Sequence, residues 1–588
     1  MKNFKIQNKI YWALLLSSIY LTQNWINFFY LAPDNPDFDK YYDYLNYFLG
    51  LNVKIDYGQG SLYYYIISII YLRKIELIDT NNIDILLSYS VQQVNFVIYL
   101  FGILGIYKLL KIKKIKLDTV LLTLSILNFF PLSIFMRSVM KPEILAFALI
   151  FWILYFLEKY LLTDSSKYLW FLIPFITLII NTKASIAGMT IVYLLIFYRE
   201  ILKKIKIREF GLLLSLFLSC LFIIQYENYR ITNLTPFERE YDIEYDNKAK
   251  ASTIYRFSIS DLFKDPFLKY DYQEDFYSIH ANSVINITLL DTFGDHFEQL
   301  FELSPSYFSK FRKKIFINDS EMFITSNRQI EYSGPFKELL INNLNKLRKI
   351  TSVILTIFFY MGIFYYSYKN KESRKFYFAP FVGIIILYAN SLGFPSNNFN
   401  PYKGDTYKSF YYVFLLTIAF TFISVEVFRK INIFKLTLFF VFIFSVFFVS
   451  GHPKSNSQNL SEHLVVMNEF SNFCEVNNIL FFENDLIKYF HKSGNINNYN
   501  SDCKNYSTYR YLQSINKPIQ NDYSKDCLDK NNKLNILLSN TDKCRIYAIK
   551  LITSKQTSKN GSPYFSLFLT SISFLIVFKD RNKMLKEK

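Results

Sequence analysis

The sequence predicts a mainly α-helical protein that crosses a membrane many times. Hydrophobic residues make up 51% of the 588 residues. They gather into runs of about 17–25 residues with few charges, the length that a helix needs to cross a hydrocarbon core of roughly 30 Å. Lysine and arginine gather between these runs, and two long polar stretches, 227–348 and 451–562, interrupt the pattern. A soluble chain of this length would instead divide into several domains with mixed composition.

Twelve segments are apolar enough to be transmembrane helices. They lie near 10–32, 86–110, 117–136, 143–162, 168–181, 184–198, 209–226, 349–368, 376–393, 409–428, 433–450 and 563–578. The first is longer than the hydrophobic part of a signal peptide, and no small-residue cleavage site follows it, so we interpret it as a signal anchor.

The basic clusters orient these helices. The net charge of +18 comes largely from short segments beside alternate apolar runs, which argues against a nucleic-acid-binding surface. The positive-inside rule places these segments in the cytoplasm, and twelve spans then leave both chain ends there. The clusters are Lys2, Lys5 and Lys9; Lys111, Lys113, Lys114 and Lys116; Arg199, Lys203, Lys204, Lys206 and Arg208; Lys369, Lys371, Arg374 and Lys375; Arg429, Lys430 and Lys435; and Lys579, Arg581, Lys583, Lys586 and Lys588.

Residues 61–78 are a thirteenth apolar segment, but a crossing there would invert every later loop. We therefore expect an interfacial or re-entrant helix on the outer side, amphipathic at its end through Arg73, Lys74 and Glu76. Four segments then face outward: 33–85, 227–348, 394–408 and 451–562. The composition, rich in Asn, Lys, Ile and Tyr, indicates an A+T-rich bacterial genome. The expected location is therefore the bacterial inner (plasma) membrane.

The chain divides into a transmembrane module over 1–450, an outer segment over 451–562, and a last helix with a basic tail over 563–588. The outer segment contains short apolar runs and predicts a small α/β domain. Its cysteines, Cys474, Cys503, Cys527 and Cys544, allow two disulfides with three connectivities; four free thiols are the alternative. Their spacing does not indicate zinc.

The first outer loop concentrates negative charge next to the membrane. Asp34, Asp37 and Asp39 lie within six residues, directly after the first apolar segment, and aromatic residues follow. A solvated turn is the ordinary explanation, since Pro, Asn and Asp favour turns. A catalytic carboxylate at the membrane surface is the alternative.

Several cations also lie at outer boundaries. Arg137 and Lys141 precede Glu143 at the start of a helix, where a negative charge is favoured. Lys183 separates two short apolar segments, and Lys403 and Lys408 precede the tenth. They are either interfacial side chains or ligands of a lipid phosphate.

Residues 289–297 bring Asp291, Asp295 and His296 close together on the outer side. A turn with a helix cap explains this composition as well as a functional site does.

These segments together resemble the GT-C glycosyltransferases, and in particular the bacterial group related to protein mannosyltransferases and the lipid A aminoarabinose transferase. The similarity covers about residues 10–430. The matching pieces, in the same order along the chain, are Pro33 to Asp39, Tyr44-Leu45, Gln59-Gly60 with Leu62-Tyr63-Tyr64, Lys141-Pro142-Glu143, Thr182-Lys183 and Thr292-Phe293-Gly294-Asp295.

The resemblance implies an inverting transfer from a polyprenyl-phosphate-linked sugar to a glycan, lipid or protein acceptor on the outer face. It implies Asp37 or Asp39 as general base, with Asp34 as the third candidate. Cations suited to the donor phosphate are Arg137, Lys141, Lys183, Lys403 and Lys408. Acceptor sugar or a divalent cation would be bound by Glu143, Asp295, His296 and Gln59.

Two other functions stay open. A transporter or flippase for lipid-linked glycans should carry charges inside several spans and show internal repeats. The sequence shows little charge within the apolar runs and no repeat. A polymerase or ligase of lipid-linked glycans uses related chemistry, and the sequence hardly distinguishes it from a glycosyltransferase.

Overall fold

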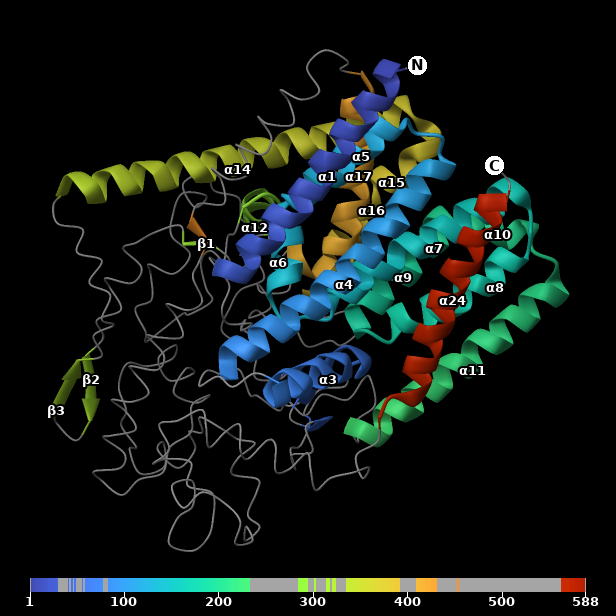
Figure 1. Cartoon of the computed structure of the whole chain (residues 1–588), viewed down its shortest axis with the longest axis horizontal. Helices are drawn as coiled ribbons and strands as arrows, with labels where there is room; N and C mark the ends of the chain where they lie inside the picture. Colours follow the sequence, from blue (N-terminus) through green and yellow to red (C-terminus); the bar gives the residue numbers. More distant parts are fainter. Residues whose placement is uncertain are drawn as a thin grey trace, which may run out of the picture.

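The computed structural model describes residues 2–29, 41, 44–45, 47–48, 55, 59–77, 83–232, 284–294, 301–302, 314–317, 320–323, 335–391, 409–430, 452–453 and 562–586. These residues are mainly helical, as expected (Figure 1). Four short strands among the described residues form two antiparallel pairs, β1 (Phe301–Glu302) with β4 (His452–Pro453) and β2 (Lys314–Ile317) with β3 (Ser320–Phe323). The predicted α/β domain, with its four cysteines, lies almost wholly outside the described residues.

The helices have the following bounds. They are α1 (Lys2–Phe29), α3 (Leu62–Leu77), α4 (Ile83–Ile112), α5 (Leu117–Asn128), α6 (Pro131–Ser138), α7 (Glu143–Thr163), α8 (Lys167–Ile180), α9 (Ala184–Phe197), α10 (Arg199–Lys204), α11 (Ile207–Thr232), α12 (Val284–Asp291), α14 (Pro335–Lys369), η3 (Lys371–Ser373), α15 (Arg374–Tyr377), α16 (Ala379–Ser391), η5 (Ser409–Tyr412), α17 (Val413–Lys430) and α24 (Tyr564–Lys586).

Among the described residues, five helices are long and apolar enough to cross a membrane. They contain Leu87–Ile112, Glu143–Thr163, Ile207–Thr232, Lys349–Lys369 and Ser409–Arg429. The bent pair α5 and α6 would be a sixth span if it crosses as one unit. Helices cover every predicted span except 433–450, which lies outside the described residues. The apolar helices fit a membrane protein, and the count of twelve crossings stays a prediction.

The predicted helix over 117–136 is not continuous. α5 ends at Asn128, α6 begins at Pro131, and the two axes differ by 60°. Pro131 has no N–H to donate and its ring clashes with the carbonyl four residues earlier, which favours a break in the helix at this point. Phe130, with φ −62° and ψ 125°, makes the extended link.

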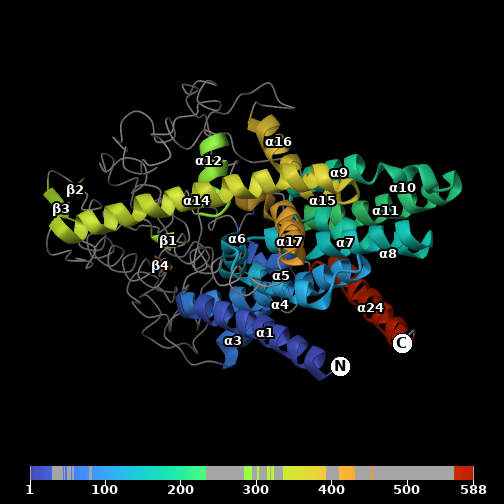
Figure 2. The same ribbon diagram turned by 90° about the horizontal axis from the view of Figure 1, so that it is seen from above.

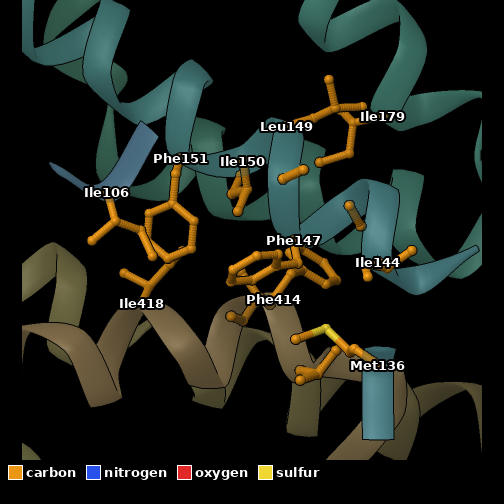
Figure 3. Close-up of a cluster of buried hydrophobic side chains, with 14 of the residues drawn as sticks. Ile106, Met136, Ile144, Phe147, Leu149, Ile150, Phe151, Ile179, Phe414 and Ile418 are labelled. Carbon is orange, nitrogen blue, oxygen red and sulfur yellow. The ribbon is translucent and has the colours of Figure 1, made fainter. Parts of the chain in front are cut away.

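α7 is the centre of the bundle, buried between α4, α8 and α17. Figure 3 shows its side chains, among them Phe147, Ile150 and Phe151, packed with Ile106 of α4 and Phe414 and Ile418 of α17. Gly102 and Gly105 of α4 permit this close packing. A Cβ at Gly102 would lie 3.1 Å from the Cα of Ala148, and one at Gly105 would lie 3.2 Å from the Cβ of Phe151. Small residues at such a crossing let two helices approach closely.

One end of the bundle, called here the basic end, collects the predicted cytoplasmic loops. Glu158 near the end of α7 forms ion pairs with Lys113 and Lys375 and accepts a hydrogen bond from the Tyr198 hydroxyl at 3.1 Å. α10, α15, the start of α1 and the end of α24 lie on the same upper side in Figure 1. Loops far apart in sequence are thus tied together by charge.

The other end, called the site end, collects the predicted outer turns. α3 lies there beside the first half of α4, where α11 ends and α24 begins (Figure 1). The Ser61 hydroxyl donates to Asn228 Oδ1 at 3.0 Å, which joins the start of α3 to α11. Both views show the first part of α14 projecting away from the bundle (Figures 1 and 2).

Candidate functional site

Three turns meet at the site end and form its framework. They are the residues before α3 (59–61), the link between α6 and α7 (139–142), and the link between α8 and α9 (181–183). The Gly60 amide donates to the Thr182 carbonyl at 3.2 Å, and a Cβ on Gly60 would lie 2.1 Å from the Asn181 carbonyl oxygen. Only glycine allows this contact between the first and third turns.

An ion pair joins the second and third turns. Lys183 Nζ lies 3.0 Å from Glu143 Oε1. Glu143 is fully buried as the first residue of α7, where the helix N-terminus favours its negative charge. Its second oxygen, Oε2, has no hydrogen-bond partner among the described residues. This oxygen of Glu143 can therefore accept a hydrogen bond from a ligand.

A second cation lies close to this pair. Lys141 is only 2% exposed, and its Nζ lies 5.3 Å from the centroid of the Phe410 ring and 5.1 Å from that of Tyr411. Lys183 Nζ lies 4.6 Å from the same Tyr411 ring. Aromatic faces attract cations at such distances. Tyr411 thus places two ammonium groups around one ring.

The short helix η5 carries this aromatic wall and is held by α12. The Ser409 amide donates to Asp291 Oδ2 at 2.6 Å, and the Ser409 and Tyr412 hydroxyls lie 3.3 Å apart. Thr292, the first residue of the Thr292-Phe293-Gly294-Asp295 element, has its hydroxyl 3.5 Å from that of Ser409. Asp291 therefore acts as a cap that fixes η5 next to the lysines.

Gln59 is buried and held by two tyrosines. The backbone amide of Gln59 donates to the Tyr44 hydroxyl at 2.6 Å. The same hydroxyl donates to the backbone carbonyl of Gln59 at 3.1 Å. The Tyr64 hydroxyl donates to Gln59 Oε1 at 3.1 Å, and the rings of Tyr44 and Tyr64 stack at 4.7 Å. These contacts hold the turn that carries Gln59.

Arg137 occupies a different position from Lys141 and Lys183. Its guanidinium is fully buried at the break between α5 and α6, where it donates to the Asn128 carbonyl at 2.8 Å and the Ser133 carbonyl at 3.1 Å. It also donates to the Thr22 hydroxyl at 3.0 Å and lies 4.6 Å from the Tyr99 ring. These contacts favour a structural role, satisfying a carbonyl that the broken helix leaves free.

The structure thus brings together Gln59, Lys141, Glu143 and Lys183. Other predicted site residues lie outside the described residues, and their roles stay predictions: Asp34, Asp37, Asp39, Asp295, His296, Lys403 and Lys408. Within the described residues, no three His, Cys, Asp or Glu side chains gather as metal ligands. Cys220 is a buried free thiol there.

Sequence reasoning missed three of the residues that hold the site, Asn95, Asn228 and Tyr411. The available signal was weak: an amide inside a long apolar run is costly to bury unless it is paired. Asn95 is such an amide, whereas Asn228 follows the seventh apolar run, at the start of a polar stretch, and gives no such signal.

No model of a protein family matches this sequence, and neither does any curated protein. The class of site therefore follows from its geometry: two lysines beside an aromatic ring suit an anion, and the open carboxylate oxygen suits a hydroxyl or amino group.

Proposed function

We propose that this protein is a membrane glycosyltransferase of the GT-C type, which moves a sugar from a polyprenyl-phosphate donor to a glycan, lipid or protein acceptor. The observation that carries the proposal is the meeting of Gln59, Lys141, Glu143 and Lys183 at the site end, away from the basic loops. These positions belong to separate sequence elements that resemble the GT-C enzymes.

The lysines would act on the leaving group. As the glycosidic bond breaks, negative charge builds up on the polyprenyl phosphate, and ammonium groups in a water-poor site stabilise it strongly. Lys141 and Lys183 lie close enough to one ring, that of Tyr411, to serve one phosphate. Lys403 and Lys408 are further candidates from the sequence.

The carboxylates would act on hydroxyl groups. Asp37 or Asp39, with Asp34 as third candidate, would take the proton from the acceptor as its oxygen attacks the anomeric carbon opposite the phosphate, which inverts the configuration. Glu143 Oε2 would accept a hydrogen bond from a sugar hydroxyl or serve a divalent cation. Asp295 and His296 stay candidates for the same tasks.

The test is transfer from a panel of polyprenyl-phosphate sugars by the full-length protein in detergent. Lys141→Ala, Lys183→Ala, Asp37→Asn and Asp39→Asn are compared with Lys204→Ala, whose side chain lies at the basic end beside Asp164. We expect losses of about 10²-fold or more for both lysine variants and at least one aspartate variant. Wild-type activity in all four well-folded variants would refute the site.

One observation favours a transporter as the second candidate. Arg137 and Glu158 are buried charges on the helices of the bundle, where the sequence suggested little charge. If wild-type protein consumes no donor but moves lipid-linked glycans across the membrane of reconstituted vesicles, the protein is a transporter and not a glycosyltransferase. Transfer of whole glycans instead of single sugars would indicate a polymerase or ligase.

A further inference from the structure

A buried asparagine on α4 fixes the turn that presents Lys141. Asn95 Nδ2 donates to the Val139 carbonyl at 2.8 Å, and the Lys141 amide donates to that same carbonyl at 3.0 Å. Val139 is extended there, with φ −107° and ψ 156°. The direction of Lys141 therefore depends on a carbonyl that Asn95 holds.

The other side of Asn95 reaches the first turn. The Tyr63 hydroxyl donates to Asn95 Oδ1 at 2.8 Å. Tyr63 lies three residues after Gly60, at the start of α3. One amide therefore connects the turn that carries Gln59 with the turn that carries Lys141.

A second buried asparagine, on α11, makes the corresponding contacts for Lys183. Asn228 Nδ2 donates to Asn181 Oδ1 at 2.6 Å, and Asn228 Oδ1 accepts from the Ser61 hydroxyl at 3.0 Å. Gln225 also donates to Asn181 Oδ1, at 3.2 Å. Asn181 ends α8 two residues before Lys183.

Both amides thus bridge the same first turn to a lysine-bearing turn, and each does so from a different long helix. Buried asparagines commonly join helices in membranes through side-chain hydrogen bonds. Here Asn95 binds main-chain oxygen of an irregular link, and Asn228 binds the residue that caps a helix. Irregular backbone in an apolar setting needs such partners.

We propose that Asn95 and Asn228 are positioning residues. Asn95 holds the turn that carries Lys141, and Asn228 holds the turn that carries Lys183. Both also connect these turns to the turn that carries Gln59. The inference rests on the proposed function for its catalytic meaning. A catalytic geometry that shifts by about 1 Å loses rate by about 10²-fold, so residues that hold it matter without touching the substrate.

The first experiment needs no substrate. Amide hydrogen exchange is compared in wild type, Asn95→Leu and Asn228→Leu, so that each variant is the control for the other. We expect exchange about tenfold faster over 139–143 in Asn95→Leu and over 181–184 in Asn228→Leu, without the reverse effects. Equal effects at both turns, or at neither, would overturn the assignment.

Milder variants guard against misfolding. Tyr63→Phe removes one buried hydroxyl that binds Asn95, and Tyr193→Phe removes one at the basic end that binds the Lys375 carbonyl at 3.1 Å. Only Tyr63→Phe should speed exchange over 139–143. An equal response in both variants would mean that any lost tyrosine hydroxyl loosens the turn, which contradicts the inference.

The second experiment uses donor turnover. We expect Asn95→Leu to raise the donor KM about tenfold, and to raise it no further when Lys141→Ala is already present, because Asn95 acts through Lys141. Additive effects in this double-mutant cycle would refute that coupling. If wild type transfers no sugar while the exchange pattern holds, the proposed function fails and the positioning of the lysines stands.

Discussion

At the scale of single residues, Gly60 makes the most restrictive contact of the site. The Cβ of an alanine there would lie 2.1 Å from the Asn181 carbonyl oxygen and 3.3 Å from the Thr182 Cα. Both neighbours are backbone atoms between two helices, so they cannot turn aside. Gly60→Ala should therefore separate the first and third turns and lower both thermal stability and donor turnover.

Gly188 provides the matched control. It lies within α9, and a Cβ there would meet nothing within 4 Å. Gly188→Ala should be neutral or stabilise the helix by about 0.5–1 kcal/mol, since glycine is a poor residue in a helix interior. Thermal unfolding in detergent and donor turnover check both variants. Similar losses in the two would show that the Gly60 contact is not special.

The sequence indicated the charged members of the site better than the residues that hold them. Lys141, Glu143 and Lys183 were visible because a charge between apolar segments is costly and needs a reason. Asn95 was not, since one amide in an apolar helix has many ordinary explanations, and Asn228 was not, since it lies at the start of a polar stretch. Their partners, Val139 and Asn181, lie far away in sequence, and only the packed helices bring them together.

At the scale of elements, Glu227 of α11 determines where α24 begins. Its carboxylate accepts from the Phe565 amide at 2.9 Å, the Ser566 amide at 3.2 Å and the Ser566 hydroxyl at 2.8 Å. Free amides at a helix start need such an acceptor, and the helix dipole adds to the attraction. Glu227→Ala should destabilise the protein by about 1–2 kcal/mol.

The effect should be local and graded. Exchange at the Phe565 and Ser566 amides should rise in Glu227→Ala and rise less in Glu227→Gln, which keeps one acceptor oxygen. Ser571→Ala is the control, because that exposed hydroxyl donates to the Leu567 carbonyl of its own helix. Unchanged exchange in Glu227→Ala would contradict the capping role.

Helix positions followed from the lengths of the apolar runs, whereas the break in the third predicted span did not. Pro131 was present in the sequence, yet a proline can also kink a helix that continues. The deciding contacts come from Arg137, whose guanidinium binds the carbonyl of Asn128, the last residue of α5. A side chain six residues after the proline thus fixes a bend that local propensity leaves open.

At the scale of the whole molecule, charge separates the two ends of the bundle. The loops near Lys113, Lys204 and Lys375 lie at the basic end, through contacts with Glu158 and Asp164. The sequence predicted this grouping because basic loops alternate along the chain. The helices that pass between the two ends include α11, so its two ends should face opposite sides of the membrane.

Cysteine labelling along α11 tests this arrangement. Lys206 immediately precedes the helix and Arg230 lies near its end; both are exposed, and a helix of 26 residues is about 39 Å long. In a background without native cysteines, an impermeant maleimide added to intact spheroplasts should label Arg230→Cys and spare Lys206→Cys. Inverted vesicles should give the opposite pattern. Labelling of both positions from one side would show that α11 does not cross, and the proposed outer-face site would then lose its topological basis.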